Sequence, residues 1–156
     1  MKISLLSIKP NKKIPEILIF NPLREGFYNM ASAKTGSWLG SMQVFDLEFK
    51  GEKSLYIDSL YIDKRKKGYG SKFLDFAKKL SKKEHNSTVF LNANSMFLGV
   101  SSTEPHAFYR KNGFTTDDKD TLKKIDEAIK TKRTLTFFDV PPTIMYWQEK
   151  MNNFLL

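Results

Sequence analysis

The segment from 64 to 71, KRKKGYGS, places four consecutive basic residues directly before two glycines. Strand-forming residues precede it and a helical pattern follows it, so it lies at a predicted strand-to-helix junction. The first amides of a helix lack partners and carry partial positive charge, which attracts phosphate. Gly68 and Gly70 let the backbone approach such a ligand. The segment predicts a pyrophosphate-binding site; G-x-G alone is a weak signal, and the P-loop pattern is absent.

The residues just before this segment repeat LYID at an interval of five, in SLYIDSLYID from 54 to 63. Side chains of a strand alternate between two faces, so residues five apart point to opposite faces. If one face stays buried throughout, one residue must be absorbed at Asp58–Ser59, which is the pattern of a β-bulge. A bulge leaves backbone groups unpaired and available to a ligand. The alternative is a strand buried on both faces.

Positive charge is concentrated in one part of the chain, which has a net charge of +9. From Lys64 to Lys83 there are nine Lys or Arg and a single acid, Asp75. Such a field attracts phosphates, nucleic acid or an acidic membrane surface. The alternative is a solvated, lysine-rich helix face.

Composition excludes several classes of site. The 156 residues contain no cysteine and only two histidines, so thiolate chemistry is absent and a metal site is not expected. The length and the 40% hydrophobic content favour a single domain spanning 1–156. No apolar run resembles a signal peptide or a membrane span, so we expect a soluble cytoplasmic protein that does not bind membranes.

Hydrophobic patterns predict an α/β (α+β) fold, a mixed sheet covered by helices. Residues 12–25 are ambiguous, with 14–20 able to form a short helix. The expected strands are 2–9, 27–33, 37–49, 54–63, 87–94, 133–140 and 143–151, and the expected helices are 69–84, 101–112 and 118–132.

Two motifs carry a resemblance to a known family. The segment 60–74, LYIDKRKKGYGSKFL, resembles motif A of the GNAT-type N-acetyltransferases, R/Q-x-x-G-x-G/A. About forty residues later, AFYRKNGF at 107–114 resembles the family's second motif, F-Y-x-x-x-G-F. A predicted helix and strand separate the two motifs, and the pair is far more specific than either motif alone.

The resemblance implies a mostly antiparallel sheet of about six to seven strands with a bulged fourth strand, and acetyl-CoA as acetyl donor. The fourth strand would pair with the pantetheine arm through Ser59, Leu60 and Ile62. Ser102 would replace an asparagine that touches the cofactor in many members. The pyrophosphate would be held by Arg65, Lys66, Lys67, Gly68, Tyr69, Gly70 and Ser71.

The same resemblance implies that Tyr109 protonates the departing thiolate, and a phenol of pKa about 10 can protonate a thiolate whose thiol has a pKa of about 8.5. Its alternative role is a core aromatic beside Phe108. Asp58 is the candidate base for the acceptor amine, or else a surface acid or a bulge-capping residue. His106 is expected on a helix surface or in a cap. Tyr56, Asn92 and Asn94 are candidate acceptor contacts; solvent-facing polar residues explain the asparagines equally well.

The function hypothesis is an N-acetyltransferase that moves acetyl directly from acetyl-CoA to a primary amine in a ternary complex. The acceptor, a small molecule or a protein, is left open because the short segment before the second strand and the extra helix in 117–135 depart from the family's pattern. One alternative is a non-catalytic binder of anionic ligands or nucleic acid. Another is an acetyl-CoA-binding member without transfer activity. Monomer and homodimer both remain open.

Overall fold

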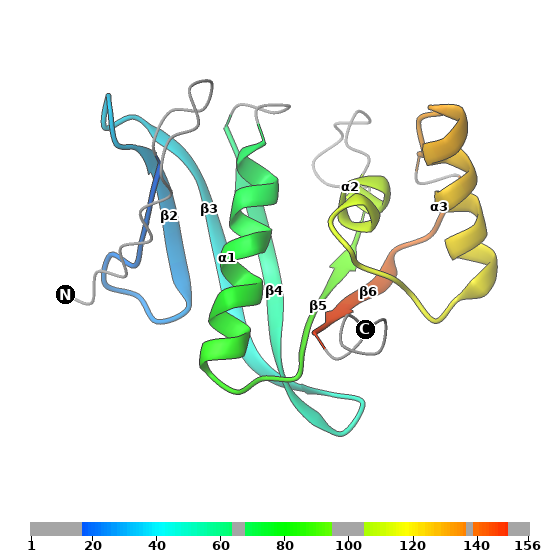
Figure 1. Ribbon diagram of the computed structural model, residues 1–156, viewed down its shortest axis with the longest axis horizontal. Helices are drawn as coiled ribbons and strands as arrows, with labels where there is room; N and C mark the ends of the chain where they lie inside the picture. The colour runs from blue at the N-terminus through cyan, green and yellow to red at the C-terminus, as the bar shows by residue number, and fades with distance from the viewer. Residues whose placement is uncertain (1–16, 64–67, 95–104, 137–138, 150–156) are drawn as a thin grey trace.

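The computed structural model describes residues 17–63, 68–94, 105–136 and 139–149. They form one six-stranded sheet in the order β1-β2-β3-β4-β5-β6, in which β4 and β5 are parallel and all other neighbours are antiparallel (Figure 1). The predicted mixed, mostly antiparallel sheet is therefore confirmed. In chain order the elements are β1 (Ile17–Phe20), β2 (Phe27–Ser32), β3 (Trp38–Phe49), β4 (Glu52–Ile62), α1 (Tyr69–Lys83), β5 (Thr88–Ala93), α2 (Pro105–Lys111), α3 (Lys119–Thr131) and β6 (Thr143–Gln148).

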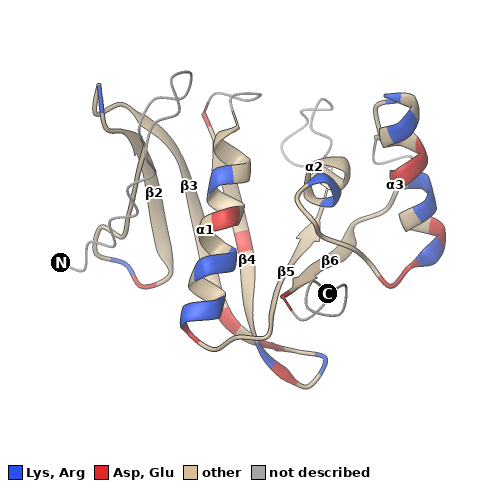
Figure 2. Cartoon of the chain, viewed as in Figure 1, with Lys and Arg blue, Asp and Glu red and all other residues tan. Residues whose placement is uncertain are grey.

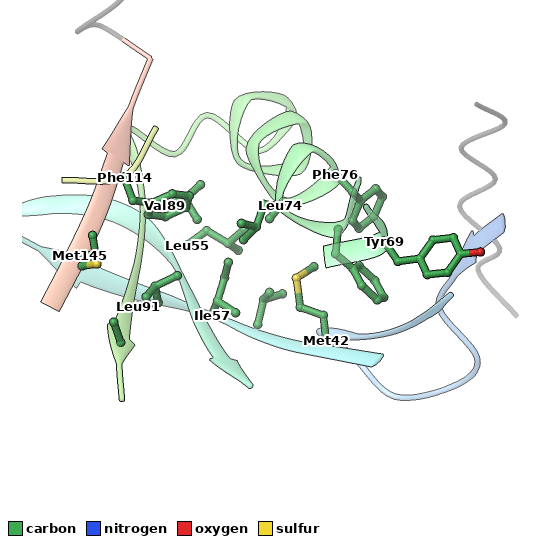
Figure 3. Packing of buried hydrophobic residues seen from close by; sticks show 14 of the residues in the cluster. Met42, Leu55, Ile57, Tyr69, Leu74, Phe76, Val89, Leu91, Phe114 and Met145 are labelled. Atoms are coloured by element: carbon green, nitrogen blue, oxygen red, sulfur yellow. The ribbon is translucent and has the colours of Figure 1, made fainter. Parts of the chain in front are cut away.

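Helix α1 connects the two parallel strands and supplies one side of the core. Its apolar residues recur at helical spacing, so Phe73, Leu74 and Ala77 all lie on one side and are fully buried. They belong to one hydrophobic cluster with strand residues such as Leu55 and Leu91. Figure 3 shows Leu74 of the helix next to Leu55 of the sheet. Truncating a buried phenylalanine such as Phe73 costs about 3–5 kcal/mol, so this contact holds the sheet and the helix together.

Helices α2 and α3 pack against each other. Asp118 caps α3 by accepting a hydrogen bond from the amide of Thr121 at 3.1 Å. Arg110 of α2 donates to the carboxylate of Asp126 on α3 at 2.8 Å. The extra basic helix predicted at 118–132 is thus a real element that covers α2.

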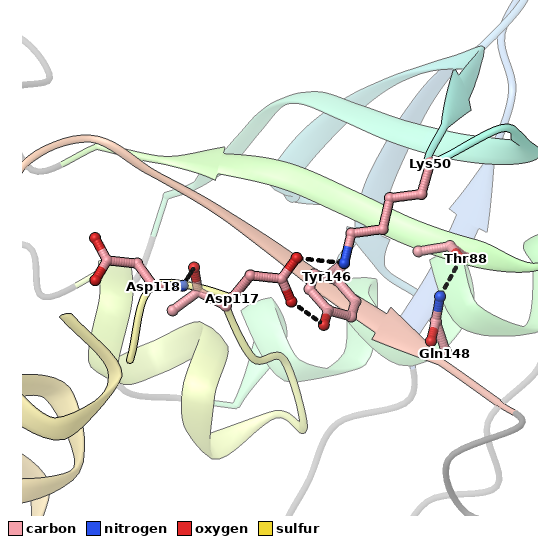
Figure 4. A network of polar contacts seen from close by, with 7 residues as sticks. Lys50, Thr88, Asp117, Asp118, Tyr146 and Gln148 are labelled. Atoms are coloured by element: carbon pink, nitrogen blue, oxygen red, sulfur yellow. Dashed lines mark hydrogen bonds and ion pairs between the residues drawn. The ribbon is translucent and has the colours of Figure 1, made fainter. Parts of the chain in front are cut away.

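A polar network ties the start of α3 to the sheet (Figure 4). Tyr146 donates a hydrogen bond to the carboxylate of Asp117 at 2.6 Å, and Lys50 in the β3–β4 turn forms an ion pair with the same carboxylate. The hydrogen bonds from Lys50 and Tyr146 lower the pKa of Asp117. The network joins the β3–β4 hairpin, β6 and the segment before α3.

Two predicted elements are wrong. The short helix considered for 14–20 is a strand in its described part, because Ile17 and Ile19 alternate with less buried residues and pair with β2. The described part of 133–140 is not a strand: the backbone amide and hydroxyl of Thr136 both donate to the carboxylate of Asp139, which forms a local turn. The predicted strand 2–9 lies outside the described residues.

Candidate cofactor and transfer site

The predicted bulge is present in β4. Val44 of β3 pairs with Ile57, and the preceding Gln43 pairs with Ser59, so Asp58 is an extra residue without a cross-strand partner in that ladder. Because the bulge absorbs one residue, the apolar residues before and after it pack on the same side of the sheet. These residues are Leu55, Ile57, Leu60 and Ile62. The alternative, a strand buried on both faces, is therefore wrong.

Strands β4 and β5 part at this bulge. Their parallel ladder runs from Ser54, paired with Thr88, to Ile57, paired with Leu91. Beyond it β4 continues alongside β3 to Ile62, while β5 continues alongside β6 to Ala93 (Figure 1). In the described part of the chain, the β4 backbone after Ile57 therefore has a ladder on one side only. An extended ligand can pair with the other side.

The N-terminus of α1 is the next described element after β4 and has no side-chain cap. Gly68 is its N-cap at φ 82, a left-handed conformation that favours glycine, and it makes no side-chain capping bond. The first intrahelical bond runs from the amide of Lys72 to the carbonyl of Gly68, so the amides of residues 69–71 have no partner within the helix. The first turn contains no acid. The predicted contacts Arg65, Lys66, Lys67 and Ser102 lie outside the described residues.

Gly68 and Gly70 lie in different environments. A Cβ on Gly68 would meet nothing within 4 Å, whereas a Cβ on Gly70 would lie 2.8 Å from the ring of Phe108. Gly70 therefore lets α2 approach α1 and brings the two sequence motifs into direct contact. The side chain of Tyr69 is buried in the core (Figure 3), so only its amide is available to a cofactor, while Ser71 is half-buried.

Tyr109 lies on α2 next to this contact. Its ring packs against Phe108 and Phe114 at centroid distances of 5.2 and 5.9 Å. Burial raises the pKa of Tyr109 to about 12, so the phenol is protonated throughout the physiological range. Tyr109 is thus part of the core packing, and its phenol keeps its proton.

Lys78, one of the lysines of the basic segment 64–83, joins α1 to the end of α2. The Lys78 ammonium donates to the carbonyl of Asn112 at 2.5 Å and lies 5.3 Å from the ring of Trp147. Burial lowers its pKa. Lys78 follows buried Leu74 by four residues, and this spacing was the available signal that it faces inward.

The expectation that His106 lies on a helix surface or in a cap is wrong. His106 is not on a helix surface but 1% exposed, with Nε2 3.0 Å from the carbonyl oxygen of Pro141. Burial lowers the pKa of His106. The residue holds α2 against the start of β6 rather than facing solvent.

The candidate acceptor residues lie on both sides of the parting strands. Asp58 is exposed at the bulge, and Tyr56 lies two residues before it, with its ring 5.0 Å from Phe90 of β5. Asn92 and Asn94 are exposed and alternate with buried Leu91 and Ala93. The predicted alternation on β5 is confirmed, while the acceptor role of these residues stays a prediction.

The described residues contain no group of three or more His, Cys, Asp or Glu side chains placed to hold a metal ion. No helix within the described ranges is long and apolar enough to cross a membrane.

Sequence comparison finds no relative: no protein-family model matches the chain, and no curated protein matches it. Solved structures do match. Ard1 from Thermoplasma volcanium aligns with a TM-score of 0.52 at 18% identity, over 80% of this chain and 70% of its own. A Staphylococcus aureus acetyltransferase of the GNAT family aligns with a TM-score of 0.50 at 17% identity, over 78% of this chain and 66% of its own.

The PaiA N-acetyltransferase from Thermoplasma acidophilum, in complex with coenzyme A, aligns with a TM-score of 0.50 at 18% identity over 78% of this chain. The chain covers 59% of the length of that protein, 25% of a Neisseria gonorrhoeae N-acetylglutamate synthase and 66% of the Staphylococcus enzyme. At these identities the likeness concerns the fold. The bulged β4, the parting of β4 and β5 and these alignments together show that the chain has the fold of the GNAT-type N-acetyltransferases.

Proposed function

We propose that the protein is an acetyl-CoA-dependent N-acetyltransferase that transfers acetyl directly to a primary amine. The observation that carries this proposal is the combination of three features. They are the bulge at Asp58, the N-terminus of α1 without a side-chain cap, and Tyr109 on α2, the helix that packs against Gly70. A patch that only attracts negative charge needs none of these three features.

The residues present fit the donor. The amides of Tyr69, Gly70 and Ser71 suit a pyrophosphate, because they have no partner within the helix and lie at its positive end. The absence of a side chain at Gly68 keeps the approach to them open. The β4 backbone from Ser59 to Ile62 offers donors and acceptors to an amide-containing arm. Bound acetyl-CoA supplies the thioester that is broken.

Asp58 and Tyr109 have complementary roles in the proposed transfer. Asp58, directly or through water, accepts a proton from the acceptor amine, so that the nitrogen lone pair can form the new C–N bond. Tyr109 donates its phenolic proton to the sulfur as the C–S bond breaks. Because burial keeps the pKa of Tyr109 at about 12, its proton is retained until the sulfur develops charge.

Tyr109→Phe tests the general-acid role. Phenylalanine keeps the ring contacts with Phe108 and Phe114 and removes only the hydroxyl. We expect kcat to fall by about 10²–10⁴-fold with acetyl-CoA affinity nearly unchanged. Thiol release in an amine screen measures kcat, and calorimetric titration measures affinity. Equal loss of binding and turnover would refute the role of Tyr109. Binding of single-stranded oligonucleotides in place of acetyl-CoA would favour the non-catalytic anion binder.

A further inference from the structure

The face of the sheet that α1 does not cover carries an unusual group of exposed side chains. Of the large apolar side chains that are exposed among the described residues, all but Leu23 lie on this face, and each is 44–49% exposed. We call this surface the open face. It consists of Trp38, Phe45, Leu47, Tyr61 and Ile144.

Strand pairing and alternation place these residues together. Phe45 pairs with Tyr56, and Tyr61 pairs with Ser41, both at positions that alternate with the buried residues packed against α1. Ile144 pairs with Asn92 in the same way on β5 and β6. Trp38 stacks on Tyr61 at a centroid distance of 5.5 Å.

The positions between these side chains carry mostly uncharged residues, and Asp58 at the bulge is an exception. The residues between them with the same orientation include Gln43, Ser59 and Asn92, whereas 28% of the whole chain is charged. Figure 2 shows charged residues on the three helices, on β4 and in the turns, whereas β5 and β6 carry none. Exposed aromatic residues combined with depletion of charge are typical of the centre of a protein interface and unlike a nucleic-acid surface.

The open face adjoins the proposed transfer site on both sides. On one side of the gap between β4 and β5, Tyr61 lies three residues after Asp58 on β4. On the other side, Ile144 of β6 pairs with Asn92 of β5. Paired neighbouring strands are about 4.8 Å apart, and β4 and β5 are no longer paired beyond Ile57, so contacts on both β4 and β6 span more than about 10 Å. A small amine at the transfer site is too short to reach both sides, whereas an extended polypeptide gains about 3.3 Å per residue.

We propose that the acceptor is a polypeptide that lies across the open face and presents a lysine or N-terminal amine, flanked by apolar side chains, to the opening beside Asp58. This inference rests on the proposed acetyl transfer and adds the class of acceptor. The connection between β1 and β2, residues 21–26, is short and contains no helix. In the described part of the chain, no helix lies between the open face and such a polypeptide.

A displayed library of random twelve-residue peptides tests the docking without requiring turnover. We expect peptides selected on the wild type to lose about tenfold in affinity for Phe45→Ser and for Tyr61→Ser, because truncation of an aromatic interface residue commonly has this effect. Leu23→Ser is the matched control: Leu23 is 86% exposed and lies outside the open face, so affinity should be unchanged. Selection of no peptide that depends on Phe45 or Tyr61 would overturn the proposal.

Turnover separates this inference from the proposed function. With selected lysine peptides we expect Phe45→Ser and Ile144→Ser, both on the open face and outside the stretch of β4 proposed to bind acetyl-CoA, to raise the peptide KM about tenfold. The acetyl-CoA titration and the rate with free lysine amide should be unchanged. Equal kcat/KM for peptides and free lysine amide would overturn the polypeptide acceptor and leave acetyl transfer intact. Absence of acetyl-CoA binding would instead refute the proposed function. Wild-type self-association that Phe45→Ser abolishes would assign the face to a second copy and overturn the inference.

Discussion

The two halves of β4 differ in their partners. From Ser54 to Ile57 the strand is paired with β3 on one side and β5 on the other, and it is buried. From Asp58 to Ile62 its only strand partner in the described part of the chain is β3, and Leu60 and Ile62 are half-buried. One extra residue, Asp58, separates a half that supports the fold from a half that is free to bind.

This difference predicts that changes in the first half reduce stability, whereas changes in the second half reduce binding. The largest contrast should come from deleting single residues. Deleting Asp58 restores one-to-one pairing with β3 and leaves Leu60 and Ile62 on the buried side. We expect the melting temperature to be unchanged or higher and acetyl-CoA affinity to fall about tenfold or more, since each lost 1.4 kcal/mol of backbone hydrogen bonding is a factor of ten.

Deleting Tyr56 is the matched control. Tyr56 lies where β4 is paired on both sides, so its loss shifts the register of the following residues and turns Ile57 to the wrong face. We expect this variant to unfold. Circular dichroism melting of both variants measures the contrast, and unfolding of both would show that the bulge itself supports the fold.

A smaller contrast should come from truncating one leucine in each half. Leu55 is 2% exposed, so Leu55→Ala should lower the free energy of unfolding by about 2–5 kcal/mol. Leu60 is half-buried, and Leu60→Ala should cost less stability while weakening acetyl-CoA binding. Urea denaturation measures both free energies. Equal destabilisation by the two changes would contradict the division of β4.

The smallest expected effect is a pH dependence of stability that originates at His106, outside both halves of β4. Burial lowers the pKa of His106 below its ordinary value of 6.5, so the unfolded chain takes up a proton first as the pH falls. The stabilisation from neutral His106 is complete above pH 6.5 and is lost as the pH falls toward the lowered pKa. His106→Gln can still donate to the carbonyl of Pro141 and does not titrate. Denaturation between pH 5 and 7 should therefore show a shallower slope for His106→Gln than for the wild type; identical slopes would contradict the assignment.

Much of this arrangement can be predicted from the sequence, because local patterns determine it. The interval of five between the LYID repeats predicts the bulge, and the helical spacing of Phe73, Phe76 and Ala77 predicts α1. What could not be predicted depends on contacts between distant segments. Three contacts require knowing where α2 lies: the hydrogen bond of Lys78 to Asn112, the burial of His106 against Pro141 and the packing of Gly70 on Phe108.

The residues of the candidate site also divide into those that the sequence predicts and those that only the structure shows. Asp58, Gly68 and Tyr109 were found from their spacing and motifs. The open face was missed, because Phe45, Leu47 and Ile144 look like ordinary strand residues until the structure shows which side of the sheet is uncovered.

Calorimetric titration of acetyl-CoA into the wild type, Gly68→Ala and Gly36→Ala tests the central claim most directly. Gly68 and Gly36 both have positive φ, 82 and 73, and a Cβ on either would meet nothing within 4 Å. The added methyl group should therefore cost each about 1–2 kcal/mol of stability through backbone strain. We predict that Gly36→Ala binds acetyl-CoA like the wild type and that Gly68→Ala loses most of the affinity. Equal affinity in all three proteins, or no binding by the wild type, would contradict the assignment of the α1 N-terminus as the acetyl-CoA site.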